Sequence, residues 1–284
     1  MSPSVIGLTV VAAGTSMPEL VVSIGAAIQG LPDVAIGNVV GSNIYNILLI
    51  LGLAALVRPL TTTWTTIRLE WPVMALAAWT MHLLSRDGML DRLEGAYLLA
   101  GLIAFVAWMV RLARKEVPDA ERESLESVAD SRAGATVGSW ARSVGGVTIG
   151  VALLGLGAHL LVSGASSLAA DLGVSQRVIG LTVVAIGTSL PELITSVLAA
   201  WRGNSAIAVG NVVGSNIFNV LGILGATALV HPIPVNLRTI ELDNWVMLGV
   251  TLMLLPLMRT GFKINRWEGG LLLAGAVVWS WTLL

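Results

Sequence analysis

Residues 180–195 read GLTVVAIGTSLPELIT, which places the carboxylate of Glu192 inside an otherwise apolar helical stretch. A charged side chain within a hydrophobic span costs at least ~2.5–3.5 kcal/mol on insertion scales, so such residues usually face a bundle interior and mark an ion or proton path. Thr188 and Ser189 lie four and three residues before Glu192, on the same helix face. We interpret this stretch as part of a cation pathway.

A proline and a glycine interrupt the same stretch. Pro191 has no backbone N–H and frees the carbonyl of Gly187 one turn earlier, while Gly187 itself is easily deformed. Ala185, seven residues before Glu192, shares its face. The sequence therefore predicts a broken helix that offers a carboxylate, two hydroxyls and loose carbonyls. These hard oxygen ligands suit Na⁺ or Ca²⁺ and do not suit soft metals.

The same text occurs earlier in the chain. Residues 5–20 read VIGLTVVAAGTSMPEL and residues 178–193 read VIGLTVVAIGTSLPEL, so Glu19 matches Glu192 at an offset of 173 residues. Further matches follow in order: AIGNVVGSNIYN at 35–46 with AVGNVVGSNIFN at 208–219, TIRLE at 66–70 with TIELD at 239–243, and, after a one-residue insertion, RLEG at 92–95 with RWEG at 266–269. The protein is an internal duplication.

The composition is that of a membrane protein. Hydrophobic residues make up 55% and charged residues 12% of the chain, and the mean hydropathy is +0.84. A soluble domain usually has about 25% charged residues. With no cysteine there is no disulfide framework and no thiolate metal site. A net charge of −1 without a basic cluster gives no sign of a nucleic-acid partner.

We expect an all-α polytopic fold of about nine transmembrane helices, because about twenty apolar residues cross a bilayer as a helix. The predicted helices lie near 4–29, 33–57, 67–85, 92–113, 142–170, 176–201, 205–230, 239–258 and 267–284. The polar segment 114–141 is predicted to link a first repeat, 1–113, to a second repeat, 142–284.

The basic residues predict the orientation of the chain. If the 114–141 linker is cytoplasmic, twelve Lys and Arg residues face the inside and four face the outside, as the positive-inside rule expects. The helices that carry Glu19 and Glu192 then run in opposite directions, so the repeats are inverted. Inverted repeats with broken helices commonly place an ion site at the repeat interface, and we expect the two glutamates to face each other there.

Two copies of the G-T-S-x-P-E helix, each followed by G-N-x-x-G-S-N-I-x-N, resemble the paired repeats of the cation/Ca²⁺ exchanger superfamily, closest to its prokaryotic Na⁺/Ca²⁺ exchanger branch. The resemblance implies antiport of Ca²⁺ for Na⁺ by alternating access in a prokaryotic inner membrane, with helix 142–170 moving against the rest. Both ions are transported and neither is a cofactor. Some members have Asp where this chain has Asn219, and that neutral residue disfavours K⁺ co-transport.

The resemblance also implies ten helices, five in each half, whereas the predicted helices give four and five. Residues 147–170 have no match in the first half, because Met1 already aligns with Val174. We therefore expect the first helix to be absent, through a misassigned start codon or in a genuinely short protein. A short protein opens the alternative of a truncated membrane protein that does not transport.

The repeat supplies a symmetric set of candidate ligands. Each glutamate has hydroxyls and a carbonyl on its face, and the next helix adds a serine and an asparagine at i and i+4. The candidates are Glu19, Glu192, Thr15, Ser16, Thr188, Ser189, Ser42, Asn46, Ser215, Asn219, Ala12 and Ala185. The alternatives are carboxylates that reach water, hydroxyls that bond the preceding turn and interhelical hydrogen bonds.

Other polar and small residues have structural explanations. Asn43 and Asn216 lie one residue off the candidate face and are expected to be structural. Gly37 and Gly41, like Gly210 and Gly214, form G-x-x-x-G pairs typical of close helix packing. Arg68, Glu70, Glu241 and Asp243 are predicted to be solvated caps at the start of a helix in each half.

A second transport mechanism, H⁺-coupled exchange, stays open because both glutamates could carry protons. No nucleophile with a matching base recurs in the two halves, so we do not expect an enzyme.

Overall fold

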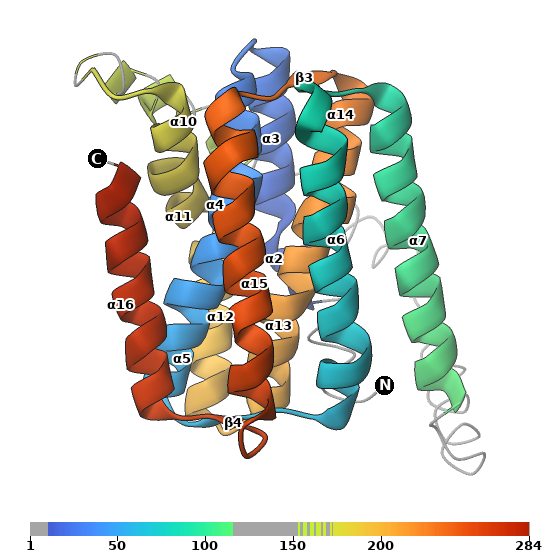
Figure 1. Cartoon of the computed structure of the whole chain (residues 1–284), viewed down its shortest axis with the longest axis vertical. Coiled ribbons are helices and arrows are strands. Elements are labelled where there is room, and N and C mark those ends of the chain that lie inside the picture. The colour runs from blue at the N-terminus through green and yellow to red at the C-terminus, as the bar shows by residue number, and fades with distance from the viewer. Residues whose placement is uncertain are drawn as a thin grey trace, which may run out of the picture.

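The computed structural model describes residues 11–115 and 173–283, with scattered positions between 153 and 171 (Figure 1). This part of the chain is helical, with four strands of two residues each. Residues 116–141 of the predicted linker and most of the predicted helix 142–170 lie outside the described residues, as do residues 4–10 of the first predicted helix. Residues 114 and 115, predicted to begin the linker, instead continue the preceding helix. Helices occupy the remaining predicted positions.

The first half runs through broken helices, a long span and a final helix. Its elements are α2 (Ala12–Thr15), α3 (Met17–Ile28), α4 (Pro32–Tyr45), η2 (Asn46–Leu51), α5 (Gly52–Val57), β1 (Leu60–Thr61), η3 (Thr66–Glu70), α6 (Trp71–Leu84), η4 (Ser85–Asp87), β2 (Met89–Leu90) and α7 (Arg92–Lys115). η4 is a 3₁₀ turn, and η2 and η3 are π-helical.

The second half repeats this order. Its elements are α10 (Gln176–Ile179), η5 (Gly180–Val184), α11 (Ala185–Thr188), α12 (Leu190–Trp201), α13 (Ser205–Ile217), η6 (Phe218–Leu224), α14 (Gly225–Val230), β3 (Ile233–Pro234), η7 (Thr239–Asp243), α15 (Asn244–Arg259), β4 (Lys263–Ile264) and α16 (Arg266–Leu283). Here η5, η6 and η7 are π-helical.

Within the described residues, four helical runs are long and apolar enough to cross a membrane, or five if a bent pair counts as one span. The four are Pro32–Val57, Arg92–Leu112, Ser205–Val230 and Thr239–Arg259, and the pair Gln176–Thr188 and Leu190–Trp201 is bent by 48°. All five coincide with predicted spans. α6 and α16 run alongside them in Figure 1.

The short strands establish that the repeats are inverted. Leu60 of β1 and Ile233 of β3 are repeat counterparts, 173 residues apart. β1 pairs with β4 through Leu60 and Ile264, and β2 pairs with β3 through Leu90 and Ile233. β3 and β4 lie at opposite ends of the bundle (Figure 1). Because β1 is paired to β4, it lies at the opposite end from its own counterpart, which confirms the predicted inversion.

Two glycine contacts interlock the halves. A Cβ at Gly95 would lie 2.7 Å from the carbonyl oxygen of Gly225, and one at Gly269 would lie 2.8 Å from that of Gly52. α7 of the first repeat therefore packs closely on α14 of the second, and α16 packs in the same way on α5. Each repeat completes the other, so we expect the two to fold as one unit.

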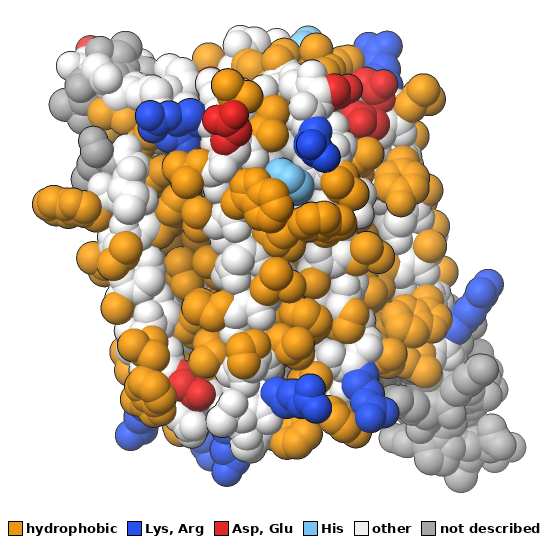
Figure 2. Space-filling model, viewed as in Figure 1, with side chains coloured by type: hydrophobic (Ala, Val, Ile, Leu, Met, Phe, Trp, Pro, Cys, Tyr) orange, Lys and Arg blue, Asp and Glu red, His pale blue; other side chains and the backbone are white. Residues whose placement is uncertain are grey.

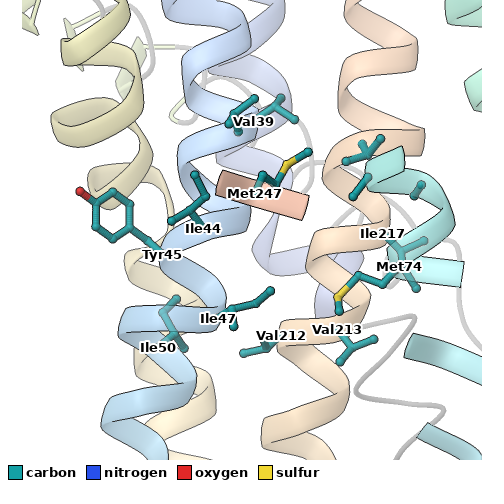
Figure 3. Close-up of a cluster of buried hydrophobic side chains, with 14 of the residues drawn as sticks. Val39, Ile44, Tyr45, Ile47, Ile50, Met74, Val212, Val213, Ile217 and Met247 are labelled. Carbon is teal, nitrogen blue, oxygen red and sulfur yellow. The ribbon is translucent and has the colours of Figure 1, made fainter. Parts of the chain in front are cut away.

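Apolar side chains pack around α4 and α13. Val39, Ile44, Val212 and Ile217 are at most 1% exposed, and Met247 of α15 reaches the same cluster (Figure 3). α4 and α13 are thus surrounded by other helices rather than by lipid. Their polar side chains have no access to bulk solvent, and each needs a partner inside the protein.

Charged side chains gather at the two ends of the molecule and leave the middle apolar (Figure 2). The end that carries β1 and β4 holds mostly basic residues, and the end that carries β2 and β3 holds most of the described acidic ones. The first group includes Arg58, Arg202, Arg259, Lys263 and Arg266, and the second includes Asp33, Asp87, Asp91, Glu94 and Glu241.

Two of the four predicted caps are not solvated. Arg68 and Glu241 are exposed as expected, but Glu70 and Asp243 are each 0% exposed. Asp243 is paired with Arg177, whereas neither oxygen of Glu70 has a hydrogen-bond partner in the part of the chain that the structure describes. The prediction was wrong for this pair because η3 and η7 pack against other helices, and those distant segments cover the two carboxylates.

Candidate cation-binding site

Each candidate glutamate lies in the first turn of a helix that begins directly after a break. Ser16 separates α2 from α3 with φ −84° and ψ 7°, and Ser189 separates α11 from α12 with φ −82° and ψ 8°. The predicted broken helices are confirmed, with the break at the serine rather than at Gly187. Helix N-termini carry a partial positive charge, which favours the carboxylates of Glu19 and Glu192 at these positions.

Serines from one repeat hold the glutamate of the other. Ser16 Oγ donates to Glu192 Oε1 at 2.9 Å, and Ser189 Oγ donates to Glu19 Oε1, also at 2.9 Å. All four residues are at most 3% exposed. The two reciprocal bonds bring the carboxylates, which are 173 residues apart in the sequence, to one place at the repeat interface.

Serines of α4 and α13 join this cluster. Ser42 Oγ lies 3.1 Å from Ser189 Oγ and 3.4 Å from the carbonyl oxygen of Ala185. Ser215 Oγ donates to Glu192 Oε1 at 3.4 Å. Ser215 therefore contacts Glu192 directly, and Ser42 is connected to Glu19 through Ser189.

The candidate asparagines lie one turn further along the same helices. Asn46 donates its backbone N–H to the carbonyl of Ser42, and it begins the π-helical segment η2. Asn219 occupies the second position of η6. π-Helical turns often occur at functional sites, because the extra residue leaves part of the backbone pattern rearranged. The sequence did not predict these turns.

Four buried oxygens in this region have no hydrogen-bond partner among the described residues: Glu19 Oε2, Glu192 Oε2, Asn46 Oδ1 and Asn219 Oδ1. Their residues are 1% exposed, so bulk solvent does not reach them. An unsatisfied buried acceptor costs about 1–3 kcal/mol, and more when charged. No ion pair within the described part of the chain involves either glutamate. The site therefore offers acceptors and negative charge without the matching positive charge.

The candidate threonines and alanines have other partners. Thr188 Oγ1 lies 3.1 Å from the carbonyl of Val184, and Thr15 Oγ1 lies 3.0 Å from that of Val11, as hydroxyls that bond the preceding turn do. The carbonyl of Ala185 accepts from the backbone N–H of Ser189 at 3.1 Å. The carbonyl of Ala12 is similarly engaged, by the N–H of Ser16 at 3.0 Å. These residues adjoin the glutamates, and each of the two carbonyls keeps a second lone pair beside its backbone hydrogen bond.

Sequence reasoning missed two asparagines that brace the site. Asn38 Nδ2 donates to Ser23 Oγ at 2.9 Å and to the backbone carbonyl of Glu19 at 3.2 Å, while its Oδ1 accepts from Thr188. Asn211 repeats this pattern around Glu192. It donates to Ser196 at 2.9 Å and to the Glu192 carbonyl at 3.4 Å, and it accepts from Thr15 at 3.3 Å. The signal was the G-N pair that recurs at the 173-residue offset.

Small residues allow the helices to meet at the site. A Cβ at Gly41 would lie 2.5 Å from the carbonyl oxygen of Leu181, and one at Gly37 would lie 2.9 Å from the backbone nitrogen of the same residue. Both distances are shorter than a carbon side chain tolerates. The glycines of α4 therefore permit direct backbone contact with η5, which confirms the packing role predicted for them.

The donor set suits a hard cation. In the part of the chain that the structure describes, no three His, Cys, Asp or Glu residues cluster as they do in zinc or iron sites. The site instead combines two carboxylates with neutral hydroxyl and amide oxygens. Ca²⁺ and Na⁺ take such oxygen ligands.

Comparisons with known proteins agree with this chemistry. The family model described as "Sodium/calcium exchanger protein" matches residues 1–111 and 142–284. Inner membrane protein YrbG of Escherichia coli (strain K12) is 39% identical over 280 residues, covering 98% of this chain and 85% of that protein. Sodium/calcium exchanger MaX1 of Methanosarcina acetivorans is 35% identical over 302 residues, covering 96% and 86%.

A solved structure extends the comparison to the fold. The sodium-calcium exchanger NCX_Mj, soaked with Na⁺ and Sr²⁺, superposes with a TM-score of 0.72 at 33% sequence identity, covering 98% of this chain and 86% of that chain. The family match spans both repeats, and the likeness extends over nearly the whole chain. The chain belongs to the sodium/calcium exchanger family.

Proposed function

We propose that this protein is a secondary antiporter that exchanges Ca²⁺ for Na⁺ across a membrane, with Glu19 and Glu192 as the charged ligands of a site at the repeat interface. One observation carries the proposal. Each glutamate is bound by a serine of the opposite repeat through one oxygen, while its other oxygen is buried without a partner. This arrangement orients both carboxylates and leaves a free acceptor on each.

The charge of the site sets what it can hold. Two carboxylates neutralise one dehydrated Ca²⁺, and two or more Na⁺ ions can use the same oxygens in its absence. Because no basic residue in the described part of the chain is paired with either glutamate, neither the calcium-loaded nor the sodium-loaded site carries a large net charge. Competition for one charge-limited site makes the transport an exchange.

The neutral oxygens favour Na⁺ over H⁺ as the second ion. Asn46 and Asn219 each present a buried amide oxygen without a hydrogen-bond partner. Such oxygens help to replace the hydration shell of a bare Na⁺. A proton needs only the carboxylates, so an H⁺-coupled exchanger would gain nothing from them. The name of NCX_Mj as a sodium-calcium exchanger supports the same assignment.

In this proposal residues 1–113 and 142–284 are the two repeats, and residues 114–141 join them in the cytoplasm. The basic end of the molecule, which carries β1 and β4, then faces the cytoplasm in keeping with the positive-inside rule. The name of YrbG as an inner membrane protein supports the same membrane for this chain.

The test is Ca²⁺ uptake into proteoliposomes loaded with Na⁺ and diluted into Na⁺-free buffer. Wild-type protein should take up Ca²⁺, and Glu19→Gln or Glu192→Gln should reduce uptake to background, because one carboxylate cannot offset a dehydrated divalent ion. Glu241→Gln, which changes an exposed carboxylate, is the matched control and should transport at the wild-type rate. Wild-type uptake by Glu192→Gln would remove the glutamates from the site.

A second arm identifies the coupling ion. Vesicles loaded with Ca²⁺ are given either an inward Na⁺ gradient at constant pH or a pH gradient without Na⁺. We expect efflux with Na⁺ alone. Equal efflux with the pH gradient would replace Na⁺ by H⁺ and leave the exchanger intact, whereas no exchange under either gradient would refute the proposed function.

A further inference from the structure

The two candidate amide ligands raise a problem of orientation. The side-chain amide of Asn46 or Asn219 has an oxygen that attracts a cation and an NH₂ group that repels it. A half turn about the Cβ–Cγ bond exchanges the positions of these two groups. Each residue leaves its oxygen unpartnered, at 1% exposure. An amide held only by packing could take either orientation. Some contact must therefore select the orientation that favours a cation.

For Asn46 that contact is a chain of hydrogen bonds with one direction. Asn46 Nδ2 donates to Asn216 Oδ1 at 3.0 Å. Asn216 Nδ2 in turn donates to the backbone carbonyl of Asn43 at 3.2 Å. A backbone carbonyl only accepts, so Asn216 must place its NH₂ toward Asn43 and its oxygen toward Asn46. Asn46 must then donate, which leaves its own oxygen free.

Asn219 is oriented in a similar way from the other side. Asn219 Nδ2 donates to Asn43 Oδ1 at 3.2 Å, and Asn43 Nδ2 lies 3.4 Å from the sulfur of Met247. A thioether sulfur is a weak acceptor and cannot donate. Asn43 therefore keeps its oxygen toward Asn219. Asn43 and Asn216 are both 2% exposed, so bulk solvent has little access to these bonds.

We propose that Asn43 and Asn216 are positioning residues that hold the amide oxygens of Asn46 and Asn219 toward the transported cation. This inference rests on the proposed function and adds to it the residues that set the orientation of the two amide ligands. The two relays cross the repeat interface: the residue of one repeat orients the ligand of the other. The amide groups of Asn43 and Asn216 are themselves engaged in these hydrogen bonds.

The relay makes a specific prediction about rescue. Asn216→Leu keeps the approximate volume but removes the acceptor for Asn46, so the Asn46 amide can turn its NH₂ toward the cation. We expect the KM for Ca²⁺ to rise about tenfold, which corresponds to about 1.4 kcal/mol, while kcat changes little. A carboxylate presents an oxygen in either orientation. In an Asn46→Asp background the same Asn216→Leu change should therefore leave the KM within about twofold of the Asn46→Asp protein alone.

The second relay provides an independent arm with built-in controls. Asn43→Leu removes the acceptor for Asn219 but keeps the Asn43 backbone carbonyl, so it should raise the KM and be suppressed by Asn219→Asp. The non-cognate pairs are the controls. Asn219→Asp should not suppress Asn216→Leu, and Asn46→Asp should not suppress Asn43→Leu. If one leucine variant does not fold, the other relay still tests the inference.

The measurements are Na⁺-driven Ca²⁺ uptake and, separately, Ca²⁺ binding by isothermal titration calorimetry of the purified protein in detergent. If a leucine variant weakens Ca²⁺ binding equally in the wild-type and both aspartate backgrounds, its asparagine has a merely structural role, and the positioning inference is overturned. Leucine variants with wild-type KM and binding would overturn it as well. Failure of the proposed function is distinct, because wild-type protein itself would then bind no Ca²⁺ and show no Na⁺-driven uptake.

Discussion

Asp243→Asn should destabilise this protein far more than Glu70→Gln, although the two carboxylates are repeat counterparts. Arg177 Nη1 lies 2.6 Å from Asp243 Oδ1 and 2.7 Å from Oδ2. The Arg177 and Asp243 side chains are 7% and 0% exposed. Removing one partner of a buried ion pair leaves the other charge uncompensated and typically costs about 3–5 kcal/mol of unfolding free energy. That loss is about a 150- to 4,000-fold change in the ratio of folded to unfolded protein.

Glu70 is buried to the same extent but has no partner to lose. Glu70→Gln removes a desolvated carboxylate and leaves no opposite charge behind. We therefore expect Glu70→Gln either to lower the unfolding free energy by no more than about 1 kcal/mol or to raise it. Denaturant unfolding in mixed micelles, followed by tryptophan fluorescence, measures both variants. Glu241→Gln is the exposed control and should stay within about 0.5 kcal/mol of wild type.

The ion pair can also be removed as a unit. Arg177→Gln combined with Asp243→Asn should recover most of the stability that Asp243→Asn loses, because no unpaired charge remains. Equal losses for Glu70→Gln and Asp243→Asn would contradict the reasoning. They would mean that Glu70 has a stabilising partner and that the two ends of the molecule are alike.

Two further predictions concern packing and ion selectivity. Gly41→Ala should prevent correct assembly, because the new Cβ would lie 2.5 Å from the Leu181 carbonyl oxygen, whereas Gly270→Ala, where nothing lies within 4 Å, should be tolerated. Size-exclusion profiles and Ca²⁺ uptake compare the two variants. Ca²⁺ exchange should proceed without K⁺, and a K⁺ gradient should not drive it, because the candidate site contains only two carboxylates. Vesicle uptake with K⁺ replaced by choline measures this, and a requirement for K⁺ would contradict the prediction.

Much of the fold could be predicted because the two halves of the sequence carry the same motifs in the same order. The motif around Glu19 is ambiguous alone, since a single apolar stretch with one carboxylate also fits a helix end near water. Its repetition around Glu192, with basic residues concentrated on one side, predicted the inverted repeats. The strand pairs β1 with β4 and β2 with β3 confirm that inversion. The broken helices were predictable for a local reason, because Pro191 cannot continue the backbone hydrogen bonding.

What the sequence did not predict depends on contacts between distant segments. Glu70 and Asp243 begin helices and are charged, which locally favours solvation, yet helices far away in the sequence cover them. Asn38 and Asn211 look like unremarkable polar residues of an apolar helix. Their bracing role arises only when the broken helix of each repeat is laid against them. The π-helical turns at η2 and η6 likewise have no simple signal in composition or periodicity.

The inversion gives a rule for which repeated residues can act together. A residue near the repeat interface contacts residues next to its counterpart in the other repeat; Ser16, for example, contacts Glu192, which lies close to Ser189. Where both repeats have the same residues at the interface, the site is therefore symmetric. A residue far from the interface lies at the opposite end of the molecule from its counterpart and acts alone. The two ends can therefore differ without disturbing the site. They do differ, because Arg177 pairs with Asp243 at one end, whereas no described basic residue is paired with Glu70 at the other. An exchanger must open to each side of the membrane in turn. An ion pair at one end and an unpaired carboxylate at the other are one means of giving the two openings different free-energy costs while the site between them stays symmetric.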